Sequence, residues 1–94
     1  MPPESQQQKT VVAMVTIGMP VYNCAGTLSQ TIRSLELQTF RDWKLIMIDD
    51  GSNDRTSEVA RQFQDERIVF LCDGKHRGLP ARLNEILQLV QTRY

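Results

Sequence analysis

The chain has 94 residues, which is enough for one small domain with a modest core. Eleven lysine and arginine residues balance eleven aspartate and glutamate residues, so the composition gives no electrostatic reason to expect a nucleic-acid or membrane-surface partner. The two cysteines, Cys24 and Cys72, do not form a zinc-binding motif. We expect two free thiols in a reducing compartment, which favours a cytoplasmic location.

Residues 1–10 are polar, with two prolines and three glutamines, and lack the pattern of a signal peptide. We predict that they form a flexible tail in front of a domain that covers residues 11–94. The longest apolar stretch, Val11 to Tyr22, is too short to span a bilayer. No membrane segment is therefore predicted.

Short apolar runs rich in β-branched residues predict three strands. They extend from about Ala13 to Met19, from Trp43 to Ile48 and from Arg67 to Cys72. Pro20 should end the first strand. Cys72 is expected to be a core residue of the third strand.

Three stretches with apolar residues at helical spacing predict helices. The first contains Leu28, Ile32 and Leu35 and ends near residues 37–39. It begins either at the T-x-x-Q capping box of residues 27–30 or one turn earlier. The second is expected from about Asn53 to Gln64, and the third from Leu79 to about Gln91, with Pro80 in its first turn.

The alternation of strands and helices predicts an α/β fold, specifically a Rossmann-like three-layer half-domain with the order β-α-β-α-β-α and a parallel sheet of strand order 3-2-1. Right-handed crossovers place the first two helices on one face of the sheet, and the third helix should lie on the opposite face. The outer edge of the first strand would then be unpaired. An unpaired edge invites pairing with another chain, so we expect a homo-oligomer through this edge.

Two adjacent carboxylates, Asp49 and Asp50, come where the second strand ends. Ligands of open α/β sheets bind at the carboxyl ends of the strands. Because side chains alternate along a strand, one carboxylate should face the ligand crevice and the other should serve the turn. Two alternatives remain open: both carboxylates only cap the loop and the following helix, or the pair binds a metal.

Four segments resemble motifs of family 2 glycosyltransferases, in the same order. The motifs are the IPVYN opening at Ile17–Asn23, the S-hydrophobic-x-x-Q-T-aromatic helix end at Ser34–Phe40, the D-D-G-S-x-D segment within Trp43–Asp54, and G-x-x-x-A-R-N at Gly78–Asn84 with Leu83 as one extra residue. The resemblance covers nearly all of residues 11–90. It implies a GT-A fold and binding of a nucleotide-diphosphate sugar, with a UDP-sugar as the favoured partner, and this chain as the amino-terminal, nucleotide-binding half.

The resemblance also implies site residues. The nucleotide-binding set comprises Pro20, Val21, Tyr22, Asp49, Asp50 and Arg82. Tyr22 would stack on the base, Asp50 would accept a hydrogen bond from the base edge, and Arg82 would lie near the base or the diphosphate. The alternatives are a Tyr22 ring that packs on the first helix and an Arg82 that is an ordinary solvated helix residue. The basic loop of residues 75–77 is expected to be solvated, and His76 is not interpreted as catalytic.

The same resemblance implies a divalent metal, Mn or Mg, for the full-length enzyme. The D-x-D motif that binds it and the catalytic base follow later in the family pattern, so no catalytic residue and no metal ligand are assigned in this chain. The predicted function is therefore donor-nucleotide binding for a glycosyltransferase. The alternatives are an inactive nucleotide-binding or protein-interaction remnant of that fold and, less favoured by the position of the acidic pair, a phosphoacceptor receiver domain.

Overall fold

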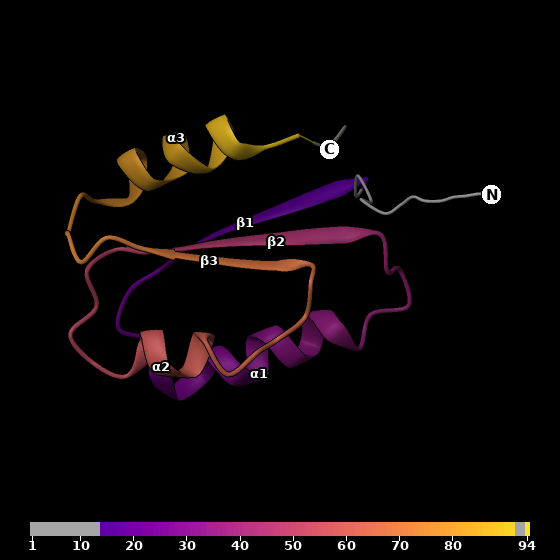
Figure 1. The fold of residues 1–94 in the computed structure, drawn as a ribbon, viewed down its shortest axis with the longest axis horizontal. Helices are drawn as coiled ribbons and strands as arrows, with labels where there is room; N and C mark the ends of the chain where they lie inside the picture. Colours follow the sequence, from indigo (N-terminus) through magenta and orange to yellow (C-terminus); the bar gives the residue numbers. More distant parts are fainter. Residues whose placement is uncertain (1–13, 92–93) are drawn as a thin grey trace.

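The computed structural model describes residues 14–91 and 94. A three-stranded parallel sheet in the order β1-β2-β3 alternates with helices, as Figure 1 shows, which confirms the predicted α/β class and strand order. The elements are β1 (Val15–Val21), α1 (Ala25–Glu36), β2 (Trp43–Asp49), α2 (Thr56–Ala60), β3 (Ile68–Cys72) and α3 (Leu79–Leu89). The register places Val15 opposite Trp43, and Leu45 opposite Ile68.

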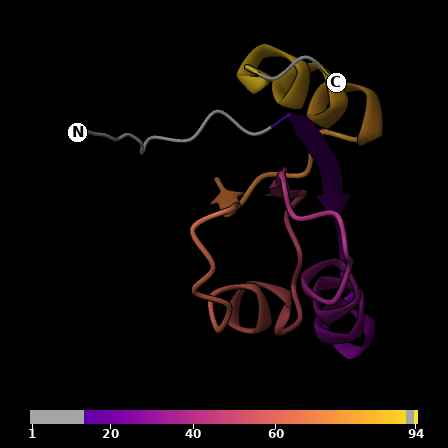
Figure 2. The same ribbon diagram turned by 90° about the vertical axis from the view of Figure 1, so that its right-hand side faces the viewer.

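The sheet is the middle of three layers. Helices α1 and α2 cover one face and α3 lies on the other, which is clearest in the end-on view of Figure 2. This is the arrangement expected when two right-handed crossovers put α1 and α2 on one face of the sheet and the third helix returns over the other face. Within the part of the chain that the structure describes, no helix has the length and apolar character needed to cross a membrane.

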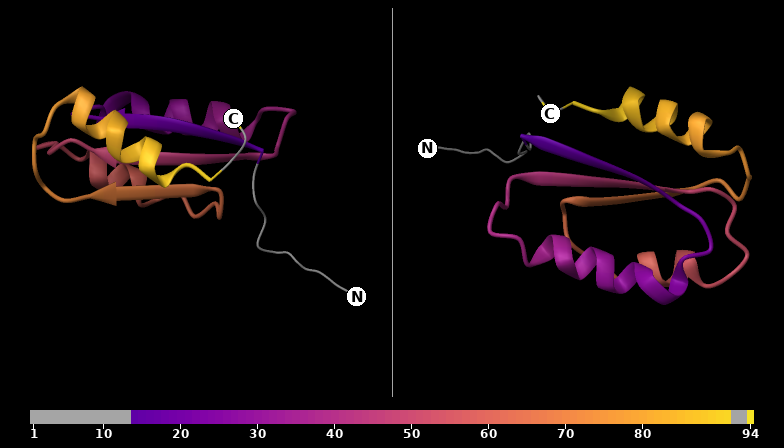
Figure 3. Two further views of the ribbon diagram at one scale, coloured as in Figure 1. Left: turned by 90° about the horizontal axis from the view of Figure 1, so that it is seen from above. Right: turned by 180° about the vertical axis from the view of Figure 1, so that it is seen from behind.

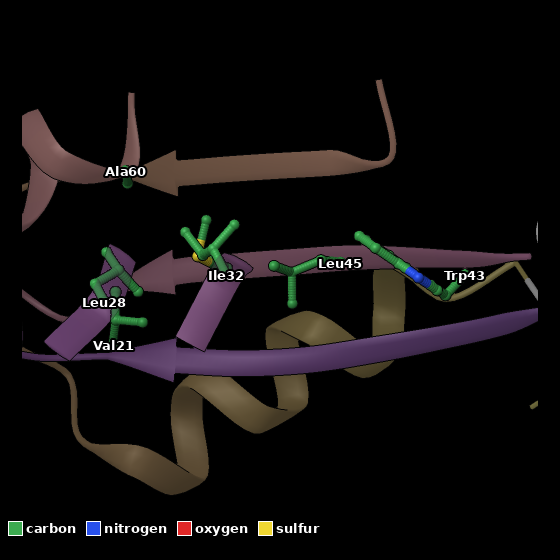
Figure 4. Close-up of a cluster of buried hydrophobic side chains, with 7 residues drawn as sticks. Val21, Leu28, Ile32, Trp43, Leu45 and Ala60 are labelled. Carbon is green, nitrogen blue, oxygen red and sulfur yellow. The ribbon is translucent and has the colours of Figure 1, made fainter. Parts of the chain in front are cut away.

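The main core lies between the sheet and the helices α1 and α2. Figure 4 shows this cluster of buried side chains, whose members are Val21, Leu28, Ile32, Trp43, Leu45, Met47 and Ala60. A smaller cluster lies between the sheet and α3 and consists of Ile46 and Ile48 from β2 and Ile86 from α3. The α3 helix packs closely on β1, because a Cβ added at Gly18 would meet Cγ2 of Ile86 at 2.6 Å. The central strand β2 is therefore buried on both faces, as its nearly unbroken apolar sequence requires.

The prediction that Pro20 ends the first strand is wrong. Strand β1 continues to Val21, with Pro20 opposite Ile48, and the amide of Asp50 donates to the carbonyl of Val21 at 2.8 Å. The N–H groups alternate in direction along the strand, and that of Thr16 points to the outer edge, where it donates to the carbonyl of Tyr94. Pro20 has the same parity as Thr16, so its missing N–H removes no bond to β2.

The second helix is shorter than predicted at both ends. The carboxylate of Asp54 accepts the backbone N–H of Thr56 at 2.9 Å, which ties residues before Thr56 into a turn instead of a helix. At the other end, the N–H groups of Gln62 and Phe63 donate to carbonyls three residues back, which tightens and closes the final turn. The first helix begins at Ala25, one turn before the capping box.

The expectation of an unpaired outer edge on the first strand is wrong where that strand begins. The N–H of Tyr94 donates to the carbonyl of Met14 at 3.2 Å, and the N–H of Thr16 donates to the carbonyl of Tyr94 at 2.7 Å. This is the hydrogen-bond pattern of a parallel pair. Figure 3 shows the carboxyl-terminal end returning beside the start of β1. Self-association through this edge remains a prediction.

Cys72 is exposed, so its assignment to the core is also wrong. It is the last residue of an edge strand, on the face of the sheet that carries α1 and α2, where its sulfur lies 3.8 Å from Oγ of Ser57 in α2. The Cys72 thiol lies 3.7 Å from Oδ2 of Asp49.

Removal of the Ile32 side chain beyond Cβ tests the main core. Ile32 is completely buried, so Ile32→Ala should lower the free energy of unfolding by about 2–5 kcal/mol. The matched control is Leu37→Ala at the end of the same helix, where the side chain is 82% exposed and the change should stay within about 0.5 kcal/mol. Urea denaturation measures both, and equal losses would contradict this description of the core.

Candidate functional site

Three loops meet at the carboxyl ends of the parallel strands. They follow β1 at residues 22–24, β2 at residues 50–55 and β3 at residues 73–78. In Figure 1 these loops lie together at the same end of the sheet. The site expected from the sequence therefore lies where the polar side chains of all three loops can converge.

The first two loops are bound to each other. The backbone N–H of Asn23 donates to Oγ of Ser52 at 2.8 Å, and its side-chain oxygen accepts the N–H of Asn53 at 2.9 Å. The N–H of Cys24 donates to Oγ1 of Thr56 at 2.9 Å. Asn23 has a φ of +47°, a conformation that asparagine tolerates better than most residues. These bonds fix the backbone that carries the half-exposed ring of Tyr22.

The two neighbouring carboxylates have different partners. Asp49 is 1% exposed and accepts hydrogen bonds from the N–H and the hydroxyl of Ser52, so it holds the turn after β2. Asp50 is 6% exposed and turns toward the loop after β3. The division between a turn carboxylate and a crevice carboxylate follows the alternation of side chains along the strand.

Donors from the third loop surround the carboxylate of Asp50. Its Oδ1 accepts the backbone N–H of Arg77 and the Nε–H of Arg82, both at 2.8 Å. Its Oδ2 lies 3.2 Å from the backbone nitrogen of Gly78 and 3.1 Å from Nδ1 of His76. These neighbours lower the pKa of Asp50. The largest effect comes from the amide of Arg77, followed by Arg82, Gly78 and His76. Asp50 is therefore an ionised hydrogen-bond acceptor at neutral pH.

Arg82 is buried, and the alternative of a solvated helix residue is wrong. Its side chain is 1% exposed although it carries a charge. Besides Asp50, its guanidinium donates to both oxygens of Asp73, to Glu85 and to the carbonyl of Lys75. A guanidinium has five N–H donors, and all of them have partners here. The Arg82 hydrogen bonds lower the pKa of Asp73, and Asp73 together with Asp50 raises the pKa of Arg82.

Gly51 lets the third loop approach the end of β2. It has a φ of +76°, where L side chains are strained. A Cβ at this position would also lie 2.9 Å from the carbonyl carbon of Lys75 and 3.0 Å from the nitrogen of His76. Both observations require glycine at the position after the acidic pair.

A cavity of about 280 Å³ opens between these loops. It is lined by Pro20, Val21, Tyr22, Asp50, His76, Gly78, Leu79 and Arg82. Five of the six residues predicted from the sequence are among them, and Asp49 is not. The rings of Tyr22 and His76 meet at the cavity, with their centroids 5.1 Å apart and their planes 56° apart.

Sequence reasoning missed the contribution of His76, Gly78 and Leu79. The available signal was positional, because the loop that follows the third strand must begin at the same edge of the sheet as the acidic pair.

The described residues do not fit a divalent metal. No group of three or more histidine, cysteine, aspartate or glutamate side chains within residues 14–91 and 94 is arranged to hold one. The carboxylates that do converge, those of Asp50, Asp73 and Glu85, are bound by the guanidinium of Arg82. We therefore derive no step through a metal from these residues.

Comparison with known proteins identifies the family. The model of glycosyl transferase family 2 matches residues 16–94. The chain belongs to this family.

Two curated relatives illustrate the match. The UDP-Glc:alpha-D-GlcNAc-diphosphoundecaprenol beta-1,3-glucosyltransferase WfgD of Escherichia coli is 35% identical over 81 residues, which cover 86% of this chain and 32% of WfgD. The glycosyltransferase GlyA of Streptococcus pneumoniae is 29% identical over 82 residues, which cover 85% of this chain and 12% of GlyA. For the first three curated relatives, this family 2 chain spans only 27% to 32% of their length.

A solved structure has the same fold. The mannosyltransferase PcManGT from Pyrobaculum calidifontis, in complex with GDP-Man and Mn²⁺, superimposes with a TM-score of 0.74 at 22% sequence identity. The match covers 85% of this chain and 25% of PcManGT. The Rossmann-like GT-A fold implied by the sequence motifs is thereby confirmed.

Loss of the Arg82 guanidinium should be costly, because it leaves Asp50 buried without its cation. We expect Arg82→Gln to lower the free energy of unfolding by about 3–5 kcal/mol. The matched control is Arg77→Gln, which removes an ion pair to Asp73 whose partners are 44% and 38% exposed and should cost at most about 1 kcal/mol. Urea denaturation at pH 7 compares them. Similar losses in the free energy of unfolding for the two variants would show that the buried Arg82 stabilises the fold no more than the exposed Arg77.

The same network predicts an acid dependence of stability. The folded state lowers the pKa of Asp50 and Asp73, so their contribution is present above the unfolded aspartate pKa of about 4 and is lost as the pH falls through the lower folded values. The free energy of unfolding should therefore decrease from pH 5 to pH 3. In Asp73→Asn this decrease should be smaller than in the wild type. Asp42→Asn, at the opposite end of β2, is the control, and an unchanged acid dependence in Asp73→Asn would refute the assignment.

Proposed function

We propose that this chain binds the donor nucleotide of a glycosyltransferase that transfers a sugar from a nucleotide-diphosphate sugar to an acceptor. The observation that carries the proposal is the cavity in which Pro20, Tyr22 and Asp50 come together at the carboxyl ends of the strands. Family membership supports sugar transfer as the reaction class. The GDP-Man in PcManGT supports a nucleotide sugar as the donor.

The chemistry of the cavity suits a nucleobase. An aromatic face such as that of Tyr22, which is 49% exposed, is a platform on which a base stacks. An ionised carboxylate only accepts hydrogen bonds, so Asp50 complements a base edge that presents N–H groups. Uracil presents one N–H on its pairing edge, and guanine presents N–H groups on two neighbouring nitrogens. We favour a UDP-sugar, because the name of WfgD specifies UDP-Glc.

The other predicted site residues hold the cavity in shape by bonds to neighbouring protein groups. All five donors of Arg82 already have protein partners, so we propose that it positions Asp50 and the third loop instead of contacting phosphate. Asp49 holds the turn that follows β2. Val21 is buried beside the cavity, where its carbonyl accepts the N–H of Asp50.

The described residues account for one part of sugar transfer, which is recognition of the base. A divalent metal would neutralise the leaving diphosphate when bound, and the Mn²⁺ of PcManGT supports such a metal for the full-length enzyme. Because its ligands are not found among residues 14–91 and 94, we propose no metal role for Asp49 or Asp50.

Titration with UDP and GDP, followed by backbone NMR chemical shifts, tests the proposal. Both nucleotides should perturb residues 20–22 and 76–79, with UDP binding more tightly. Tyr22→Ala should weaken binding by about 5- to 150-fold, the range for loss of one base-stacking contact. Asp50→Asn should also weaken binding, because an amide presents a donor where the base edge needs an acceptor.

Phe40→Ala is the matched control for Tyr22→Ala. Phe40 is 50% exposed, like Tyr22, but lies before β2, away from the carboxyl ends of the strands. It should leave the affinity for nucleotide unchanged. A folded wild-type sample whose chemical shifts respond to neither nucleotide at millimolar concentration would overturn the proposed function.

A further inference from the structure

Within the nucleotide site proposed above, we infer that His76 blocks the carboxylate oxygen that the base uses. Its Nδ1 is hydrogen-bonded to the backbone carbonyl of Asp50 and lies 3.1 Å from Oδ2 of the same residue, so a base that pairs with Oδ2 must displace the ring. His76 is then a displaceable gate over the site. The inference depends on the proposed function and adds a self-blocking contact to it.

The two oxygens of Asp50 differ in how firmly their donors are held. Oδ1 accepts the Arg77 amide and the Nε–H of Arg82, which belong to the backbone and to a side chain that is 1% exposed. A ligand cannot replace these donors without unfolding the loop or stripping a buried cation. Oδ2 accepts the backbone N–H of Gly78 and lies 3.1 Å from the ring of His76. Of these groups beside the carboxylate, the ring of His76 is the one that can leave by side-chain rotation alone, at the cost of its hydrogen bond to the backbone carbonyl of Asp50.

The exposure of His76 allows this rotation. Its side chain is 65% exposed, whereas that of Asp50 is 9% exposed. The backbone of residues 75–76 is fixed against Gly51, so the ring can move while the loop stays in place. Nδ1 lies 3.1 Å from Oδ2 and 3.1 Å from the backbone carbonyl of Asp50. Both groups are acceptors, so Nδ1 carries a proton.

The ring of His76 also lies against the ring of the proposed stacking residue, Tyr22. Its centroid is 5.1 Å from that of Tyr22. A base between two rings needs about 7 Å, which is twice a carbon–carbon contact of about 3.5 Å. The rings are thus too close to hold a base between them. A base held between the two rings requires the same displacement of His76 that frees Oδ2 of Asp50.

The affinities of His76 variants for UDP and GDP test this gate. His76→Ala removes both the donor and the ring, and should bind UDP about 3- to 10-fold more tightly than the wild type, the net value of one hydrogen bond. In His76→Asn the side-chain nitrogen is as many bonds from the backbone as Nδ1, so it can restore the block and should keep the affinity near that of the wild type. Lys75→Ala, an exposed neighbour in the same loop, is the control and should leave the affinity unchanged.

The outcomes separate the gate from other roles of His76. Weaker binding by His76→Ala would mean that the ring contacts the base, and an unchanged affinity would mean that His76 plays no part; either result overturns the gate while the nucleotide site stands. A failure of the wild type and all variants to bind either nucleotide overturns the proposed function and the gate together. A second readout is the NMR signal of the His76 ring, which should move when UDP is added to the wild type as its bond to Asp50 is lost.

Discussion

The ion pair between Arg82 and Asp50 is the interaction on which the site depends. It joins the first turn of α3 to the end of β2, and through Asp73 and the carbonyl of Lys75 it also holds the loop after β3. Burial of a charged group is costly unless every donor finds a partner. Arg82 meets this condition with five donors and five acceptor atoms, and these bonds tie the loop after β3 to the end of β2.

This arrangement has a consequence for recognition. Asp50 stays ionised because backbone amides and a guanidinium surround it, and an ionised carboxylate rejects a ligand edge that presents only acceptors. The proposed selectivity for bases with an N–H group therefore depends on the charge state of Asp50, which Arg82 and the loop amides maintain. The side chain proposed to touch the base and the side chain that sets its ionisation are different residues on different elements.

The sequence was sufficient for the features that depend on local pattern. Short apolar runs predicted the strands, and the alternation of strands and helices predicted their order. The alternation of side chains along β2 predicted that Asp49 and Asp50 point in different directions, and their hydrogen-bond partners confirm this. Features that depend on the assembled sheet were not predictable in this way. Pro20 can remain in β1 because its nitrogen, which carries no hydrogen, faces away from β2. The direction in which this nitrogen faces is known only when the register of the two strands is known.

The site shows the same division. The motifs indicated Arg82 as a site residue. Its partners Asp73 and Glu85 lie nine and three residues away in the sequence, and they accept hydrogen bonds from the guanidinium only in the folded loop. His76 carried no pattern at all, since a lone histidine in a basic loop has no periodic or spacing signal. Its part in the site appears only when the end of β3 is placed beside the end of β2.

The distribution of firm and loose contacts then decides how the site can respond to a ligand. Backbone hydrogen bonds hold Asp50, Gly78 and the loop after β1, and Gly51 keeps the third loop against the sheet. The exposed rings of Tyr22 and His76 are the parts of the cavity wall that can turn without breaking these bonds. Binding of a ligand in this cavity therefore costs little free energy for the ordering of loops. Its affinity depends on the exchange of the contact between His76 and Asp50 for a contact between the ligand and Asp50.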